Sequence, residues 1–189
     1  MNILLLGEKC SLINDTLILK GHNTFLFNDK IMAENVLHYD FIISFGYRHI
    51  IKKDIIGLFP DKIINMHISY LPYNKGADPN LWSYLENSPK GVTIHKIDAG
   101  LDTGDILLQK KVQDNIEDTL KTSYDRLINE IFSLFNENVD NILNNKINAF
   151  KQQGKGSTHY LKDKEKYMYL LEKSGYDTPV KELLGKALI

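Results

Sequence analysis

Residues 2–27 read NILLLGEKCSLINDTLILKGHNTFLF and contain a complete strand–helix–strand unit. The apolar run Asn2 to Leu6 predicts a short buried strand. Leu12 to Lys20 has helical character, and Gly21 stands at the position that commonly follows the end of a helix. Thr24 to Phe27 predicts a second strand. A strand, a helix and another strand within 26 residues favour an α/β fold.

The same alternation continues along the chain. Further strands are predicted at residues 40–45, 62–66, 91–97 and 105–112, and further helices at 52–58, 80–86 and 119–144. The last helix has the clearest periodic stripe of apolar residues. We therefore predict a Rossmann-like, mainly parallel sheet with helices on both faces.

The composition is that of a globular protein of ordinary size. The chain has 189 residues, of which 43% are hydrophobic and 25% charged, and its formal net charge is -1. A near-neutral charge gives no general attraction to nucleic acid. Cys10 is the single cysteine, so an internal disulfide is excluded. No apolar run is long enough to span a membrane, and no signal peptide is recognisable, which predicts a cytoplasmic protein without membrane association.

The composition changes after Phe150. Residues 151–189 contain eight lysines and five acidic residues. We predict a catalytic domain at residues 1–150 and a short carboxy-terminal extension at 151–189. This extension is expected to fold against the domain, contact substrate or contact a second subunit.

Polar residues gather where strands are predicted to end. Asn65 and His67 are two positions apart, so their side chains project to the same side of an extended strand. Asp102 lies in a loop between Gly100 and Gly104, whose backbone turns freely. An amide and an imidazolium stabilise a developing oxyanion, and a carboxylate accepts a proton. These three residues predict acyl transfer to a neutral nucleophile.

The run Asn65-Met66-His67-Ile68-Ser69-Tyr70-Leu71-Pro72, followed by Gly76 and by Gly100-Leu101-Asp102-Thr103-Gly104-Asp105, resembles the 10-formyltetrahydrofolate-dependent formyltransferases. The resemblance covers residues 40–112 and implies the formyltransferase fold. It implies Asn65, His67 and Asp102 as catalytic residues and N10-formyltetrahydrofolate as co-substrate, with no metal.

The resemblance also implies two sets of binding residues. Those expected at the folate are Tyr47, His49, Ile50, Ile51, Asp98, Gly100 and Asp102. Those expected at the substrate are Ser69, Lys75, Gly76 and Asn80. Family habit further suggests a homodimer.

Departures from the family pattern distinguish its branches. The chain has no room for the RNA-binding domain of the tRNA enzymes. The segment Gly7 to Ser11 has one glycine and an acidic residue, where the glycinamide ribonucleotide enzymes have a glycine-rich phosphate loop. Residues 74–83 and 154–163 look most like the sugar branch. The expected activity is therefore N-formylation of a nucleotide-linked amino sugar, a step in making surface polysaccharides such as lipopolysaccharide.

Other interpretations remain open at this point. One is a phosphoribosylglycinamide formyltransferase of purine synthesis, and another is a folate-binding module without turnover. A metal hydrolase using His67, His95 and Asp102 is more distant, because the spacing is not that of a metal site. His95 is either an orienting residue for Asp102 or a core histidine. Trp82 is expected to pack within its helix, and Lys155 or His159 could meet a substrate phosphate.

Overall fold

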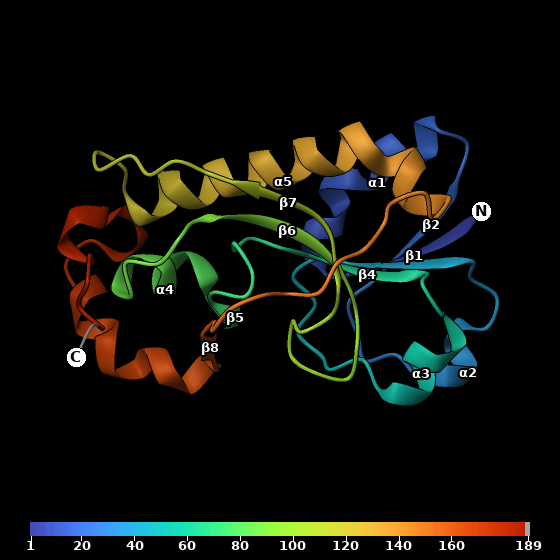
Figure 1. The fold of residues 1–189 in the computed structure, drawn as a ribbon, viewed down its shortest axis with the longest axis horizontal. Helices are drawn as coiled ribbons and strands as arrows, with labels where there is room; N and C mark the ends of the chain where they lie inside the picture. Colours follow the sequence, from blue (N-terminus) through green and yellow to red (C-terminus); the bar gives the residue numbers. More distant parts are fainter. Residues whose placement is uncertain (188–189) are drawn as a thin grey trace. The chain divides into compact units, whose positions relative to one another are not determined.

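The structure is a computed structural model that describes residues 1–187 (Figure 1). Its residues form two compact units. Unit 1 contains residues 1–67, 94–108 and 132–151, and unit 2 contains residues 68–93, 109–131 and 152–187. Strands β6 (Gly91–Lys96) and β7 (Ile106–Lys111) and helix α5 (Leu120–Leu143) each contribute residues to both units.

Unit 1 is built on an open sheet with the strand order β2-β1-β3-β4-β6-β7. The bounds of its first four strands are β1 Asn2–Leu6, β2 Asn23–Phe27, β3 Phe41–Ser44 and β4 Ile63–His67. β1 pairs in parallel with β2 and β3, and β3 pairs in parallel with β4. A hairpin loop connects β6 to β7. At the base of this loop the Lys96 N–H donates a hydrogen bond to the Asp105 carbonyl at 2.9 Å. This mainly parallel architecture confirms the predicted fold class.

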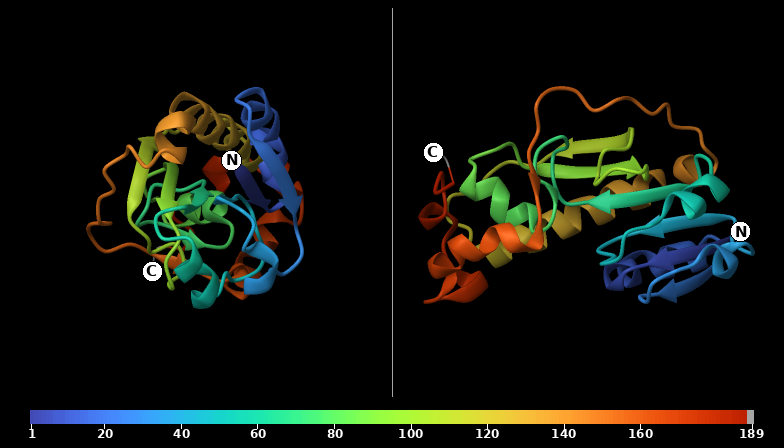
Figure 2. Two further views of the ribbon diagram at one scale, coloured as in Figure 1. Left: turned by 90° about the vertical axis from the view of Figure 1, so that its right-hand side faces the viewer. Right: turned by 90° about the horizontal axis from the view of Figure 1, so that it is seen from below.

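Helices cover both faces of this sheet (Figures 1 and 2). α2 (Ala33–Val36) and α3 (Lys53–Leu58) lie on one face, and α1 (Ser11–Leu19) lies with the carboxyl half of α5 on the other. The core under α2 and α3 consists of Leu4, Leu6, Ile31, Val36, Ile42, Ile55, Phe59 and Ile63. Each of these buried side chains stabilises the unit by about 1.5–3 kcal/mol relative to exposure.

The end of α1 shows how closely local sequence determines this unit. Gly21 adopts φ +82°, a left-handed conformation that costs glycine little. Its N–H donates to the Ile18 carbonyl at 2.9 Å, and the His22 N–H donates to the Leu17 carbonyl at 3.1 Å. These two bonds satisfy the last carbonyls of the helix. The predicted end of the helix is confirmed.

Unit 2 contains short elements around a separate apolar core. Its elements are β5 Lys75–Gly76, α4 Pro79–Leu85, β8 Thr158–His159 and the 3-10 segments Leu161–Leu171, Gly175–Asp177 and Val180–Glu182. The core comprises Leu81, Trp82, Tyr84, Leu85, Leu120, Leu171, Val180 and Leu183. The predicted boundary at residue 150 lies where the chain passes into unit 2, but the tail packs there with residues 68–93 and 109–131. No helix within residues 1–187 is long and apolar enough to cross a membrane.

Candidate active site

The strand β4 presents Asn65 and His67 at its carboxyl end. It runs between β3 and β6 in the middle of the unit 1 sheet. The two-residue period of a strand directs both side chains to one side. His67 is 7% exposed and Asn65 is half-buried. The sheet therefore holds both groups firmly while leaving part of them accessible.

Asp102 belongs to the loop between β6 and β7. Asp98 shapes this loop, because its Oδ1 accepts hydrogen bonds from the Gly100 N–H at 3.0 Å and the Thr103 hydroxyl at 2.6 Å. At Gly104 a Cβ atom would collide with the carbonyl oxygen of Lys96, so the turn requires glycine. Asp102 itself adopts φ +52°, a conformation that aspartate tolerates better than most residues.

These elements bring Asn65, His67 and Asp102 together. The Asn65 amide Nδ2 donates to Asp102 Oδ1 at 3.2 Å. His67 Nδ1 lies 3.7 Å from Asp102 Oδ2, an ion-pair distance, and the two side chains are 9% and 12% exposed. The contact therefore pairs the imidazole with a carboxylate inside the protein. The three residues predicted from the motif are thus one cluster in space.

His95 joins the same cluster. It is 2% exposed, and its Nδ1 lies 2.8 Å from its neighbour's backbone carbonyl, that of Lys96. Because a carbonyl only accepts hydrogen bonds, Nδ1 carries a proton. His95 Nε2 lies 3.3 Å from Asn65 Nδ2 and 3.5 Å from Asp102 Oδ1. The sequence left open whether His95 was a core residue, and the geometry places it against both polar partners.

Cys10 offers no alternative nucleophile. The thiol is fully buried, and its Sγ donates to the carbonyls of Leu6 at 3.3 Å and Ile43 at 3.5 Å. Burial raises its pKa to about 12, so the reactive thiolate is scarce at neutral pH. The polar cluster around Asp102 suits proton transfer and oxyanion stabilisation rather than covalent catalysis.

The residues expected at the folate lie in unit 1 beside exposed apolar side chains. The Tyr47 hydroxyl donates to the Asp29 carbonyl at 2.7 Å, and the ring of His49 contacts the Tyr47 ring edge-on at 5.3 Å. Ile51 is half-buried, whereas Ile50 is 84% exposed. In the Asp102 loop, Leu101 is 40% exposed. Exposed apolar groups on both segments fit the binding of a flat heteroaromatic ring.

The residues expected at the substrate lie in unit 2 and differ in their surroundings. Ser69 is 3% exposed, and its Oγ has no hydrogen-bond partner among the described groups. Lys75 and Gly76 form β5. Asn80 Nδ2 donates to the Leu120 carbonyl at 2.8 Å, and its Oδ1 accepts from Ser123 at 2.9 Å. Both ends of the Asn80 amide are therefore engaged, which favours a structural role over the predicted substrate contact.

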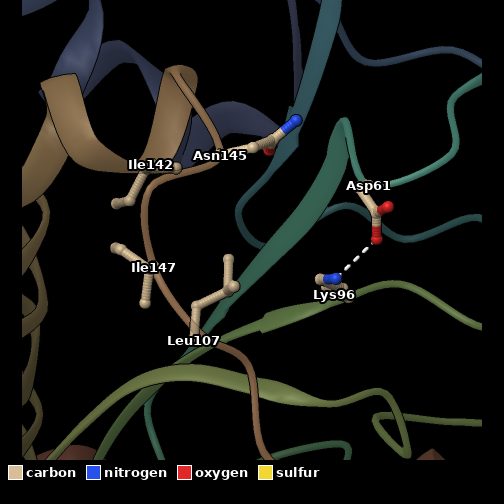
Figure 3. A pocket seen from close by; sticks show the side chains of 6 residues that line it. All are labelled: Asp61, Lys96, Leu107, Ile142, Asn145 and Ile147. Carbon is tan, nitrogen blue, oxygen red and sulfur yellow. Dashed lines mark hydrogen bonds and ion pairs between the residues drawn. The ribbon is translucent and has the colours of Figure 1, made fainter.

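Unit 1 also contains a small hollow. Figure 3 shows its lining, which consists of Asp61, Lys96, Leu107, Ile142, Asn145 and Ile147. Its volume is about 130 Å³, below the roughly 300–1,000 Å³ of ligand pockets. Two of these residues, Asp61 and Lys96, form an ion pair 2.5 Å long. None of the three motif residues lines it, so we do not regard it as the active site.

Unit 2 holds a second histidine–carboxylate pair that the sequence did not reveal. His159 Nε2 lies 2.9 Å from Glu86 Oε1, and the His159 ring stacks on Trp82 at 3.7 Å between centroids and 5° between planes. Glu86 Oε2 also accepts hydrogen bonds from Ser157 at 2.7 Å and Asn74 at 2.9 Å. Burial lowers the pKa of His159 from its ordinary value. Because the His159 ring stacks on Trp82 and its Nε2 contacts Glu86, we expect this histidine to have a structural role rather than a catalytic one.

Comparison with known proteins identifies the family. A sequence model described as formyl transferase matches residues 24–138, more than half of the chain. The chain therefore belongs to the formyl transferase family, as its motifs predicted.

Relatives of known structure and sequence show how far the likeness extends. The formyltransferase PseJ of Anoxybacillus kamchatkensis, solved with UDP-4,6-dideoxy-4-formamido-L-AltNAc and tetrahydrofolate, is 51% identical. It superposes with a TM-score of 0.95 over 99% of this chain and 100% of its own. An N-formyltransferase of Helicobacter canadensis, solved with folinic acid and dTDP-3-aminofucose, shares the fold at 23% identity and a TM-score of 0.77. The superposition covers 100% of this chain and 80% of the Helicobacter canadensis chain.

The curated relatives are longer proteins. The methionyl-tRNA formyltransferase of Finegoldia magna is 38% identical over 105 residues, which is 55% of this chain and 34% of that protein. This chain thus matches about a third of the length of that relative.

Proposed function

We propose that this protein transfers the formyl group of N10-formyltetrahydrofolate to the amine of a nucleotide-linked amino sugar. The observation that carries the proposal is the cluster of Asn65, His67 and Asp102, joined at 3.2 and 3.7 Å. The likeness to PseJ, whose structure contains a formylated nucleotide sugar and tetrahydrofolate, supports this choice of substrate class.

The side chains in and beside the two segments expected at the folate, residues 47–51 and 98–102, suit such a co-substrate. Ile50 and Leu101 expose apolar surface to a flat ring, and the Asp98 carboxylate holds the loop through Gly100 and Thr103. When bound, the folate supplies the formyl carbon that the amine attacks.

His67 and Asn65 stabilise the negative charge that develops on the formyl oxygen during this attack. Asp102 keeps His67 charged and accepts the proton that the amine loses, directly or through water. The bond between the formyl carbon and N10 then breaks, N10 takes up a proton, and tetrahydrofolate leaves. The two hydrogens of Asn65 Nδ2 face Asp102 and His95, so one of these contacts must be exchanged when the amide turns to the oxyanion. All these groups come from β4, β6 and the loop after β6.

The segment after β1 disfavours the glycinamide ribonucleotide alternative. A 3-10 turn, Glu8–Cys10, begins directly after Gly7, and Glu8 lies in its first turn. At Gly7 a Cβ would collide with the Phe45 carbonyl oxygen, so this glycine is needed for packing. A carboxylate at the start of the turn opposes binding of a terminal phosphate.

Substrate choice is tested by steady-state kinetics. Nucleotide-linked amino sugars and glycinamide ribonucleotide are supplied at equal concentration with N10-formyltetrahydrofolate. We expect a higher kcat/KM for the amino sugars. Faster turnover of the ribonucleotide would assign the protein to purine synthesis. Folate binding without formyl transfer in a single-turnover assay would instead favour the non-catalytic binding module.

Further features of the proposed protein come from the sequence. We place it in the cytoplasm, without membrane or nucleic acid partners, as a homodimer supplying precursors of surface polysaccharides. Light scattering measures the oligomeric state, and fractionation of cells measures the location.

A further inference from the structure

The segment of unit 2 around β5 has an uncommon backbone. Asn74, Gly76 and Asp78 adopt φ angles of 53°, 85° and 53°, all in the left-handed region. Glycine adopts this region at little cost, whereas residues with a Cβ atom keep it where surrounding contacts hold them. Lys75 lies between the first two of these residues, and the family resemblance implies that it contacts the substrate. The contacts that hold this loop therefore determine where Lys75 lies.

The carboxy-terminal segment around β8 holds the loop through its main chain. β8 pairs in parallel with β5 (Figure 1). The Lys75 N–H donates to the Ser157 carbonyl at 3.0 Å. At Gly156 a Cβ atom would collide with the carbonyl oxygen of Pro72, so the segment comes closer to the loop than a residue with a side chain would allow. The two segments are thus in contact along their main chains.

The hydroxyl group of Ser157 adds a side-chain link to the loop. It accepts a hydrogen bond from the Asn74 N–H at 3.0 Å and donates to Glu86 Oε2 at 2.7 Å. Asn74 is fully buried, its Nδ2 donates to the same Glu86 oxygen at 2.9 Å, and its Oδ1 accepts from Ser88 at 2.8 Å. The main chain and the side chain of Asn74 are both fixed, and the Ser157 hydroxyl joins them to the carboxy-terminal segment.

The ammonium group of Lys75 is not engaged within the described chain. The residue is half-buried, and its Nζ forms no ion pair or hydrogen bond with residues 1–187. By contrast, Lys164 pairs with Asp78 at 2.8 Å. A cation that is carried by an ordered main chain and has no carboxylate partner suits an anionic group of a ligand. The phosphates of a nucleotide-linked sugar are groups of this kind.

We propose that Ser157 is a positioning residue for substrate binding. By fixing Asn74, it holds Lys75 where the ammonium binds the phosphates of the nucleotide-linked sugar. This inference rests on the proposed function and gives the carboxy-terminal extension a role in substrate affinity. Because Ser157 acts through Lys75, its loss should weaken binding of the sugar nucleotide and leave the chemical step and the folate unaffected.

Steady-state kinetics of Ser157→Ala test this role. The varied substrate is the nucleotide-linked amino sugar that the unmodified chain uses with the highest kcat/KM. We expect its KM to rise about 3–10-fold, since one hydrogen bond to the loop is lost. The kcat and the KM for N10-formyltetrahydrofolate should stay within about twofold, and Ser157→Thr, which keeps the hydroxyl, should restore the original KM.

Ser123→Ala is the matched control in unit 2. The Ser123 hydroxyl is also bonded twice, since it accepts from the Tyr84 hydroxyl at 2.8 Å and donates to Asn80 Oδ1 at 2.9 Å. Its loss should lower the melting temperature without changing the KM for the sugar nucleotide. The same result for Ser157→Ala would show a purely structural role and overturn the proposal. An equal rise of KM in both variants would show a general loosening of unit 2 and overturn it as well.

A double-mutant cycle tests whether Ser157 acts through Lys75. Lys75→Met removes the charge, keeps most of the length of the side chain and should raise the KM for the sugar nucleotide roughly 10–100-fold. In that background Ser157→Ala should add less than about twofold, because the group that it positions is already gone. Full additivity overturns the proposal. An unchanged KM in Lys75→Met also overturns it, whether or not the Ser157 variant folds.

The same measurements separate this inference from the proposed function. If the unmodified chain formylates no nucleotide-linked amino sugar, the proposed function is wrong and the phosphate-binding role of Lys75 is wrong with it. If it formylates such a sugar and Ser157→Ala leaves the KM unchanged, only the positioning role is wrong.

Discussion

Each unit of this protein contains a histidine beside a carboxylate, and the two pairs differ in their surroundings. In unit 1, Asp102 contacts the amide of Asn65 as well as His67, and the ring centroids of His67 and His95 are 6.4 Å apart. In unit 2, His159 is stacked on Trp82 at 3.7 Å.

A histidine beside a carboxylate does not by itself define an active site. Around His67 the neighbours are polar groups at the end of a strand, which can exchange protons and hydrogen bonds with a ligand. The neighbours of His159 are the indole ring of Trp82 and the carboxylate of Glu86. This carboxylate already accepts hydrogen bonds from Ser157 and Asn74. We therefore expect the unit 1 pair to determine turnover and the unit 2 pair to determine stability.

Asp102→Asn should have the largest effect. It retains an acceptor oxygen for Asn65 but removes the negative charge and the proton acceptor. We expect kcat at pH 7 to fall by roughly 10²–10⁴-fold. NMR titration should show the His67 ring gaining its proton at lower pH than in the unmodified protein. An unchanged His67 titration would mean that Asp102 acts only as a proton acceptor.

His67→Asn tests oxyanion stabilisation in the same cluster. Loss of the imidazolium should lower kcat by about 10²–10³-fold. Folate affinity should change little, because the residues expected at the folate lie on other segments. His38→Asn alters an exposed histidine of unit 1 and should retain full activity. Activity of the His67 variant within a few-fold of the original would contradict the proposed role.

His159→Gln should act on stability. The change removes the ring that stacks on Trp82 and the contact with Glu86, which we expect to lower the free energy of unfolding by about 1–3 kcal/mol. The melting temperature should fall by roughly 2–12 °C. Calorimetry measures the loss, with His38→Gln as the control. A melting temperature equal to that of the control would show that the stack contributes nothing.

The pH dependence of unit 2 should be the smallest effect. Burial lowers the pKa of His159 in the folded chain, although Glu86 and Asp163 oppose this and Lys166 adds to it. The unfolded chain therefore binds a proton first as the pH decreases. The contribution of neutral His159 to the stability of the folded chain is fully present above about pH 6.5. This contribution is lost as the pH falls toward the lowered pKa of His159.

Fluorescence of Trp82, the single tryptophan, follows the same protonation. A protonated imidazole quenches a stacked indole more strongly than a neutral one. We expect intensity to decrease with a midpoint below pH 6.5, and His159→Gln to abolish the transition. A transition that survives this substitution would belong to another group.

Local sequence determined most of the secondary structure and half of the candidate active site. The strands β1 and β4 and the long helix α5 follow from apolar runs and helical periodicity, which depend on neighbours within a few residues. The alignment of Asn65 with His67 follows from the period of one strand. The family was also accessible from sequence, because its motifs occur in order along the chain, and the match at residues 24–138 confirms it.

Very short helices and strands could not be predicted from hydrophobic periodicity. α2 has four residues, and β5 and β8 have two each, which is too few for any period to emerge. Such elements form because the surrounding chain supplies their partners, as β8 does for β5.

Only the tertiary structure decided which distant polar groups meet. Asp102 lies 37 residues after Asn65, and the sheet brings their side chains to 3.2 Å, with His95 against both. Tertiary packing also engaged the Asn80 amide with Leu120 and Ser123, a role that its sequence neighbours do not specify. Periodicity determines the face on which a side chain lies. Its hydrogen-bond partners depend on contacts between remote segments, which form only when the chain folds.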